Sequence, residues 1–329
     1  MDKILMTHGG GGSMMQSFID EIFISKFDNQ YIKEMEDAAL LPGKIVFTTD
    51  SFVVKPLFFP GGDIGRLSVC GTVNDISMRG AKPLFLSASF IIEEGFPVDD
   101  IKRIVNSMED TANEAGVQIV TGDTKVVEKN SADGVFINTA GIGILPDGAD
   151  ISIKNGKPGD VVIISGTIGD HGMAVMSARE EINFEPPLFS DVSPLNKMVE
   201  KLATLKSAVK ILRDPTRGGV AEVLYEIANM SNVGIKIYED KLPVKESVKS
   251  ACSMLGLDYL HLANEGKLVC VVERDYADEA LKLMKEDIYG KDASIIGEIN
   301  DTGLVTIETV YGTTRIVDRP LGELLPRIC

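Results

Sequence analysis

The sequence predicts an α+β protein of two domains. The predicted strands and helices do not alternate strictly, as they would in a doubly wound parallel sheet. The chain has 329 residues, which is more than one domain usually holds. A polar stretch, residues 146–160, places two prolines and three glycines between two apolar strands, and we place the domain boundary there. The predicted divisions are residues 1–150, residues 151–318 and a C-terminal tail of residues 319–329.

The first half begins with a helix over residues 14–27, because apolar side chains recur there at helical spacing and Ser13 can cap the helix. Another helix is expected over residues 99–115, with Asp99 at its N-cap and Gly116 just past its end. The remaining predicted elements are a strand at 45–49, a helix at 63–78, and strands at 83–92, 117–121 and 135–145.

The second half repeats this mixture of strands and helices without a short-period sequence repeat. Its predicted strands are residues 161–165, 233–238, 267–272, 294–299 and 303–317. Its predicted helices are residues 170–180, 195–206, 219–230, 246–255 and 275–287.

Composition excludes several classes of protein. The chain contains 33 Lys and Arg against 49 Asp and Glu, a net charge of −16, so it would be repelled by nucleic acid and by anionic membranes. No apolar run is long enough to span a bilayer, and the N-terminus lacks the apolar core of a signal peptide. Four cysteines without a CxxC pair and three histidines favour free thiols in a reducing cytoplasm over a zinc or iron–sulfur site. Cys70, Cys252 and Cys270 lie in apolar contexts that predict packing roles.

Acidic residues stand at the ends of predicted strands and in neighbouring turns. They are Asp50, Asp75, Asp123 and Asp214. Carboxylates in such turns are suitable ligands for Mg²⁺ beside the phosphates of a nucleotide. Each one alone is as well explained as a cap or turn former.

Two glycine-rich segments could approach an anion. Gly10 and Gly11 belong to a run of four glycines ahead of the first helix, whose N–H groups could bind phosphate. The run lacks the pattern of a Walker A loop, and a flexible arm is an equal alternative. The segment 214–219 is more specific, because Arg217 can pair with phosphate and two glycines follow it. Its alternative is an ordinary turn before a helix.

Three polar residues are candidates for proton transfer or charge stabilisation. Lys125 follows Gly122-Asp123-Thr124, Glu265 lies in Asn264-Glu265-Gly266, and His171 lies in Gly169-Asp170-His171-Gly172. A Lys and a Glu in apolar surroundings suit charge stabilisation and proton abstraction. Spacing alone leaves Lys125 and Glu265 open as solvated loop residues and His171 as a cap partner.

The chain ends in Pro326-Arg327-Ile328-Cys329, so its last residue carries both a thiol and a carboxylate. Residues 319–329 can span roughly 35 Å when extended. Two prolines and one glycine in this tail disfavour helix and predict a mobile arm. The alternative is a frayed terminus with an incidental cysteine.

Together these segments resemble the carbamoyl dehydratases of hydrogenase maturation, within the superfamily of aminoimidazole ribonucleotide synthetase and selenophosphate synthetase. The similarity covers nearly the whole chain, and the terminal cysteine distinguishes this family from the rest of the superfamily. The segments that carry it are the glycine-rich opening, Thr49-Asp50-Ser51, Asn74-Asp75, Gly122-Asp123-Thr124-Lys125, residues 165–172, residues 213–219, Asn264-Glu265-Gly266 and the last four residues. The resemblance implies a synthetase-like, ATP-binding N-terminal domain that forms an intersubunit β-barrel in a homodimer, and a C-terminal α+β domain with a mobile tail.

The resemblance also implies that the chain is its own substrate. A partner carbamoyltransferase would load Cys329 as an S-carboxamide, ATP and Mg²⁺ would drive its dehydration to a thiocyanate, and an iron-holding maturation complex would accept the cyanide. Glu265 is implied as the base and Lys125 as the charge-stabilising group. The implied metal ligands are Asp50, Asp75, Asp123 and Asp214, and the implied ATP contacts are Asp50, Asn74, Asp75, Asp123, Thr124, Gly10, Gly11 and Arg217.

Two other functions stay open at this point. A related ATP-dependent synthetase acting on a free small molecule would not need Cys329. A carrier that only holds a group on Cys329 would not turn over ATP.

Overall fold

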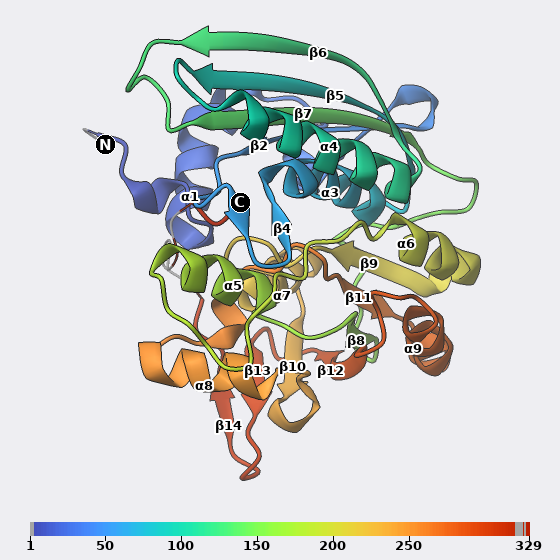
Figure 1. The fold of residues 1–329 in the computed structure, drawn as a ribbon. Helices are drawn as coiled ribbons and strands as arrows, with labels where there is room; N and C mark the ends of the chain where they lie inside the picture. The colour runs from blue at the N-terminus through green and yellow to red at the C-terminus, as the bar shows by residue number, and fades with distance from the viewer. Residues whose placement is uncertain (1–2, 320–324, 326) are drawn as a thin grey trace.

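The computed structural model describes residues 3–319, 325 and 327–329, which form two large β-sheets and one two-stranded sheet, with helices packed between and around the large sheets (Figure 1). The predicted tail therefore lies partly outside the described residues. Within the described part of the chain, no helix is both long and apolar enough to cross a membrane. Cys70, Cys252 and Cys270 are buried, which confirms their predicted packing role.

The first sheet has five strands in the order β1-β2-β7-β5-β6. All neighbours are antiparallel except β5 and β6, which are parallel and joined by helix α4. The strands are β1 (Ala39–Leu41), β2 (Ile45–Phe52), β7 (Val135–Ile144), β5 (Lys82–Glu93) and β6 (Gln118–Val127). Helices α3 (Ile64–Met78) and α4 (Val98–Ala115) cover one face, and a short hairpin of β3 (Phe58–Phe59) and β4 (Gly62–Asp63) precedes α3.

Helix α3 lies between the first sheet and the second half of the molecule. Nearly every residue along it is buried, from Ile64 to Met78. The Asp63 side chain caps the helix by accepting a hydrogen bond from the Arg66 N–H at 3.0 Å. A helix that is buried on all sides can present a polar side chain to a site between domains, and α3 does so with Asp75.

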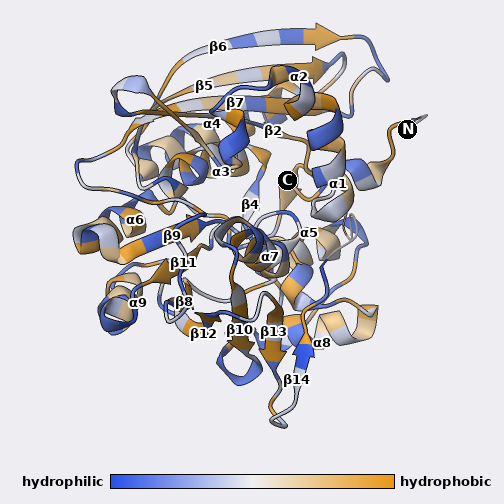
Figure 2. Ribbon diagram, turned by 180° about the vertical axis from the view of Figure 1, so that it is seen from behind, coloured by the Kyte–Doolittle hydropathy of each residue, from blue (hydrophilic) through white to orange (hydrophobic). Residues whose placement is uncertain are grey.

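The second sheet has seven strands in the order β14-β13-β10-β12-β8-β11-β9. Strand β8 is buried on both faces, because its alternate side chains enter separate hydrophobic clusters. In Figure 2 the central strands are hydrophobic and the edge strand β14 is hydrophilic. The strands are β8 (Val161–Ile164), β9 (Val209–Arg213), β10 (Gly234–Tyr238), β11 (Val269–Val272), β12 (Ser294–Asn300), β13 (Val305–Glu308) and β14 (Thr314–Ile316). The helices are α5 (Asp170–Arg179), α6 (Asn196–Leu202), α7 (Gly219–Ser231), α8 (Glu246–Leu255) and α9 (Ala277–Lys285).

Several sequence-based assignments were wrong. The predicted strand 303–317 is divided into β13 and β14, the predicted helix 195–206 ends as α6 at Leu202, and β1 was missed. The predicted N-terminal helix is divided into α1 (Gly12–Ile19), a π-helical segment Asp20–Ile24 and α2 (Ser25–Phe27). Helix α4 begins before Asp99, with Pro97 in extended conformation at the N-cap, so Asp99 acts only through its charge in the first turn. Strand β6 continues past residue 121 because it pairs with β5. Strand β9 was missed because it is a short run that contains Lys210 and ends at Arg213.

The two halves are joined at a seam of buried polar contacts. The Asn74 amide on α3 donates to the Ser193 carbonyl at 3.1 Å, and its oxygen accepts from the Leu195 N–H at 2.8 Å. Glu36, ahead of β1, accepts hydrogen bonds from the Ser152 hydroxyl and the Ile153 N–H, and it pairs with buried Arg79 at 2.7 Å. These contacts fix the position of α3 relative to the second half.

Asn74→Ala should destabilise the protein, because it leaves the Ser193 carbonyl and the Leu195 N–H buried without their partner. We expect a loss of about 1–3 kcal/mol in the free energy of unfolding, measured as a lower urea midpoint. Asn113→Ala, on the exposed face of α4, is the matched control and should leave the midpoint unchanged. Equal midpoints for the two variants would contradict the role given to Asn74.

Candidate functional site

An acidic cavity of about 350 Å³ lies at the seam between the two halves. Its walls come from both halves, because Asp50 is on β2, Asp75 is on α3, and Asp214 follows β9. The ionisable and thiol groups that line it include Asp37, Asp50, Asp75, Asp214, Glu265 and Cys329. The site therefore contains the tip of the tail together with most of the predicted acidic residues.

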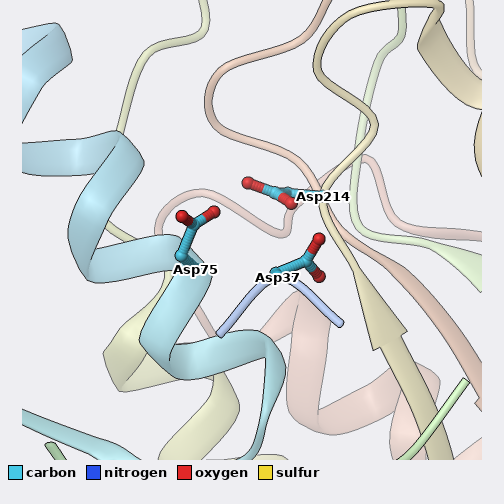
Figure 3. A group of neighbouring side chains, drawn as sticks. All are labelled: Asp37, Asp75 and Asp214. Carbon is cyan, nitrogen blue, oxygen red and sulfur yellow. The ribbon is translucent and has the colours of Figure 1, made fainter. Parts of the chain in front are cut away.

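Three of these carboxylates converge (Figure 3). Asp37, Asp75 and Asp214 each place an oxygen within 4.8 Å of the others. Thr48 holds this arrangement, because its hydroxyl contacts the Asp75 carboxylate at 2.9 Å and the Asp37 carbonyl at 3.0 Å. Arg213 pairs with Asp37 at 2.9 Å. One oxygen of Asp37, Oδ2, is buried and has no hydrogen-bond partner among the described residues.

Burial, and after it the crowding of like charges, raises the pKa values of the acidic cluster. Removal from water raises the pKa of Asp214 from 3.8 to about 6, with Arg213 acting in the opposite direction. The same burial raises the pKa of Asp75 well above its usual range, and Asp214 and Asp50 raise it further. Burial also raises the pKa of Asp37, opposed by Arg213. The cluster thus favours a bound proton or a cation.

Glu265 lines the cavity, and one of its carboxylate oxygens, Oε1, is buried with no hydrogen-bond partner among the described residues. Its backbone N–H donates to Asp191 at 3.1 Å, and Asp191 pairs with buried Lys267 at 3.3 Å. Gly266 is required in this turn, because a Cβ there would lie 1.8 Å from the Asp191 carbonyl. Burial raises the pKa of Glu265 well above its usual range, with Asp214 and Asp50 adding to the effect. A carboxylate in this environment is a stronger base than one in water.

Cys329 reaches the cavity because the last residues are held against the first half. It lines the cavity, and an oxygen of its terminal carboxylate accepts from the Val53 N–H at 3.0 Å. Figure 1 shows the C-terminus lying between the two sheets, near α1. His171 lies beside this segment rather than in the cavity, with its Nε2 2.8 Å from the Ile328 carbonyl. The predicted mobility of residues 319–329 stays a prediction, because several of them are outside the described residues.

A larger cavity of about 590 Å³ adjoins the acidic one, and the two share Met15, Thr216 and Arg217 in their walls. Gly11 lines this cavity, and Gly10 is buried nearby in the same turn. The Arg217 guanidinium donates to the Gly9 carbonyl at 3.1 Å, which joins the two glycine-rich segments that the sequence singled out.

Asp123, Thr124 and Lys125 do not reach the cavity of their own subunit. They lie on β6, the exposed edge of the first sheet, where Lys125 pairs with Asp123 at 2.6 Å. In the strand register Asp123 is level with Ser51 of β2 but three strands away, about 14 Å at the usual spacing. Within one subunit, Asp123 therefore lies too far from the acidic cavity to be the metal ligand that the sequence predicted.

Two further differences concern the predicted contacts. Asn74 was predicted to contact ATP, but it is not among the residues that line the cavity. Its side-chain amide instead forms hydrogen bonds with backbone groups of the second half. Asp37 was missed by the sequence analysis. It follows Glu36 in a loop with no motif around it, and only the pairing with Arg213 and Thr48 brings it to Asp75.

Comparison with known families matches both halves of the chain. Residues 35–145 match the AIR synthase related protein N-terminal domain, and residues 157–309 match the C-terminal domain of the same family. A solved structure of a thiamine monophosphate kinase, AaThiL complexed with AMPPCP and TMP, is 18% identical with a TM-score of 0.72, which shows a shared fold.

Closer relatives share one name. "Carbamoyl dehydratase HypE" of Rhizobium leguminosarum bv. viciae is 51% identical, covering 99% of this chain and 95% of that protein. The HypE chain in a crystal structure of a HypE–HypF complex is 73% identical with a TM-score of 0.91, covering 92% of this chain and 100% of that one. A crystal structure of the hydrogenase maturation protein HypE in complex with ATP is 45% identical with a TM-score of 0.85, covering 99% of this chain and 100% of that one. The chain belongs to the carbamoyl dehydratase HypE family, within the AIR synthase related proteins.

Proposed function

We propose that the chain uses ATP to dehydrate an S-carboxamide carried on its own Cys329, and so forms the thiocyanate that supplies cyanide during hydrogenase maturation. One observation carries this proposal: the C-terminal residue Cys329 lines the same acidic cavity as Glu265, Asp75 and Asp214. The relatives named carbamoyl dehydratase and the ATP complex of HypE support it.

ATP fits the pair of adjoining cavities. The larger cavity has apolar walls from Met15, Ile19 and Ile32 that suit a nucleoside. Arg217 borders both cavities, where it can pair with phosphate oxygens between them. This arrangement would place the γ-phosphoryl group beside the acidic cluster and near Cys329.

The acidic cluster fits a divalent cation. Asp37, Asp75 and Asp214 offer the oxygen ligands that Mg²⁺ prefers, Asp37 has an unpartnered oxygen, and Asp50 lies on the same wall. Bound there, Mg²⁺ supplies positive charge that offsets the repulsion between these carboxylates and the phosphates of ATP.

The dehydration is feasible because phosphorylation turns the amide oxygen into a leaving group. That oxygen attacks the γ-phosphorus, and ADP departs. Two protons leave the nitrogen as the nitrile forms and the C–O bond to phosphate breaks. Glu265 is positioned to accept one of these protons, since it lines the same cavity as Cys329 and its Oε1 has no hydrogen-bond partner among the described residues, and the other proton leaves on the phosphate product. The products are the thiocyanate, ADP and phosphate.

A homodimer explains the outer face of the first sheet. This face is away from α3 and α4 and carries large apolar side chains that are between 38% and 44% exposed: Ile45, Phe47, Phe85, Ile91, Ile142 and Ile144. Joining two such faces into a β-barrel buries the apolar side chains and pairs exposed strand edges. Asp123 and Lys125 stand on the same face by register, so we infer that they serve the cavity of the other subunit.

Loading and delivery require two partners. A HypE that is 73% identical to this chain is seen in complex with HypF. We infer that an equivalent carbamoyltransferase loads Cys329 here, and that an iron-holding maturation complex takes the cyanide from it.

Glu265→Gln should leave the loaded carboxamide unconverted, because it removes the base without changing the size of the side chain. We expect conversion to slow by on the order of 10²–10⁴-fold. Mass spectrometry of carbamoyl-loaded protein incubated with ATP and Mg²⁺ would follow loss of one water from the Cys329 peptide. Glu109→Gln, at an exposed position of α4, is the control, and this variant should convert the carboxamide normally. Normal conversion by Glu265→Gln would show that Glu265 is not the base. In a separate test, undiminished ATP turnover by Cys329→Ala would indicate that the substrate is a free small molecule.

Asp214→Asn should stabilise the metal-free protein at pH 7. The raised pKa, about 6, means that the native state holds this proton more tightly than the unfolded chain, so stability falls as the pH rises from about 4 to above 6. Removing the charge should raise the free energy of unfolding by about 1–3 kcal/mol at pH 7 and by little at pH 4. Urea unfolding at both pH values, with and without MgCl₂, measures this, and Asp147→Asn on the surface is the control. A Mg²⁺ response unchanged by Asp214→Asn would contradict the metal site.

Mixing two inactive variants should restore activity if Lys125 acts across the dimer. In a dimer of one Lys125→Ala and one Glu265→Gln chain, the Lys125→Ala chain keeps its own Glu265 and receives Lys125 from its partner. Random exchange should restore about a quarter of the normal conversion, since half of the dimers are mixed and one of their two sites is intact. Mass spectrometry separates the chains, and the nitrile should appear only on the Lys125→Ala chain. Absence of recovery after verified exchange would show that Lys125 does not act across the dimer.

A further inference from the structure

The backbone of Glu265 is held on both sides by hydrogen bonds. Its N–H donates to Asp191 Oδ1 at 3.1 Å. Its carbonyl accepts from the Ser193 N–H at 3.4 Å and from the Asn74 amide at 3.4 Å. The carboxylate oxygen Oε1 is buried and has no hydrogen-bond partner among the described residues. The position of this carboxylate is therefore set through the backbone of Glu265 rather than through a hydrogen bond to Oε1.

Asp191 and Lys267 form a buried ion pair beside this turn. Their side chains are 3% and 8% exposed, and Asp191 Oδ2 lies 3.3 Å from Lys267 Nζ. The same Nζ donates to the Gly266 carbonyl at 2.9 Å, so the lysine contacts both the aspartate and the turn that carries Glu265. Neither Asp191 nor Lys267 is among the described residues that line the acidic cavity. The pair therefore acts on the cavity through Glu265 rather than by touching its contents.

The segment that carries Asp191 is anchored to helix α3. Arg66 Nε donates to the Val192 carbonyl at 2.9 Å. The Asn74 amide donates to the Ser193 carbonyl at 3.1 Å. Both donors are on α3, which also carries one carboxylate of the acidic cluster. These anchors fix the segment around Asp191 relative to that cluster.

We propose that Asp191 is a positioning residue: by accepting a hydrogen bond from the Glu265 N–H, it holds the general base at a fixed place relative to the acidic cluster, and Lys267 holds Asp191. This inference rests on the proposed function in taking Glu265 as the base. A base acts only within hydrogen-bond reach of the proton that it removes. A displacement of about 1 Å can lower a rate about 100-fold.

Two double variants isolate this hydrogen bond. Asp191→Asn with Lys267→Met removes both charges but keeps an oxygen that can accept from the Glu265 N–H. Asp191→Leu with Lys267→Met has nearly the same shape and lacks that oxygen. Removing the two charges together avoids leaving one of them buried without its partner. Asp191→Ala with Lys267→Met is smaller than either and should behave like the Asp191→Leu pair.

The first readout is conversion of carbamoyl-loaded protein with ATP and Mg²⁺, followed by mass spectrometry of the Cys329 peptide. At saturating ATP, the Asp191→Leu pair should convert on the order of 10–100-fold more slowly than the Asp191→Asn pair. The ATP concentration that gives half the maximal rate should change by less than about two-fold, because ATP does not contact Asp191 under the proposal. A role in folding alone would lower the urea midpoint and leave the rate of the folded protein unchanged.

The second readout is hydrogen exchange at the Glu265 N–H, which does not depend on activity. NMR of protein labelled with isotopic nitrogen in glutamate should show this N–H exchanging at least about ten-fold faster in the Asp191→Leu pair than in the Asp191→Asn pair. Asp287→Leu with Lys201→Met is the matched control and should change neither readout. Asp287 likewise accepts a backbone N–H, from Tyr289 at 3.2 Å, and pairs with Lys201 at 3.1 Å, and both residues lie outside the cavity lining.

Two outcomes separate this inference from the proposed function. If native protein forms the nitrile, but the Asp191→Leu and Asp191→Asn pairs convert equally fast or exchange the Glu265 N–H equally fast, Asp191 does not position the base and the proposed function stands. If exchange differs as expected but loaded native protein never forms the nitrile, Asp191 still holds Glu265 in place and the proposed function fails.

Discussion

Mutual repulsion among buried carboxylates is the constraint around which this molecule is organised. Asp37, Asp75 and Asp214 are held within 4.8 Å of one another, and burial together with like charge raises their pKa values. No single element could hold them there. Rigid α3, the loop ahead of β1 and the end of β9 each bring one carboxylate, and Arg213 offsets part of the charge. Under the proposed function, the stability given up at this seam would be recovered when a cation and phosphates bind.

The position of the tail turns the same cavity into a site for an intramolecular reaction. Under the proposed function, cargo on Cys329 would meet Glu265 at an effective concentration set by the covalent connection and by the contacts of Arg327 and Ile328. Recognition and chemistry are thus separated. Residues 53 and 55 hydrogen-bond to the last residues of the tail, whereas the cavity that Cys329 lines holds the residues proposed for the chemistry.

The first sheet links catalysis to assembly. Its inner face positions Asp50 and packs on α3, while its outer face exposes apolar side chains and carries Asp123 and Lys125. The proposed dimer, built on that face, would bury apolar surface and bring the Lys125 cation toward a cavity whose own subunit supplies mostly carboxylates. Such a dimer would explain why Asp123 and Lys125 suit the proposed chemistry by residue type although they lie three strands away from β2 and the cavity of their own subunit.

The sequence by itself determined the α+β class, most strands and helices, the burial of three cysteines and the separation of Cys329 from them. These follow from local periodicity and composition, which each segment carries independently of its neighbours. Glu265, Asp75 and Asp214 were also found from sequence, because each stands in a short recognisable segment. Only the tertiary structure decided which residues meet: Asp37 has no local motif, and Asn74 holds two halves together from 119 residues away from its partner Ser193. Contacts between residues far apart in the chain depend on the packing of whole elements, and no local pattern records them.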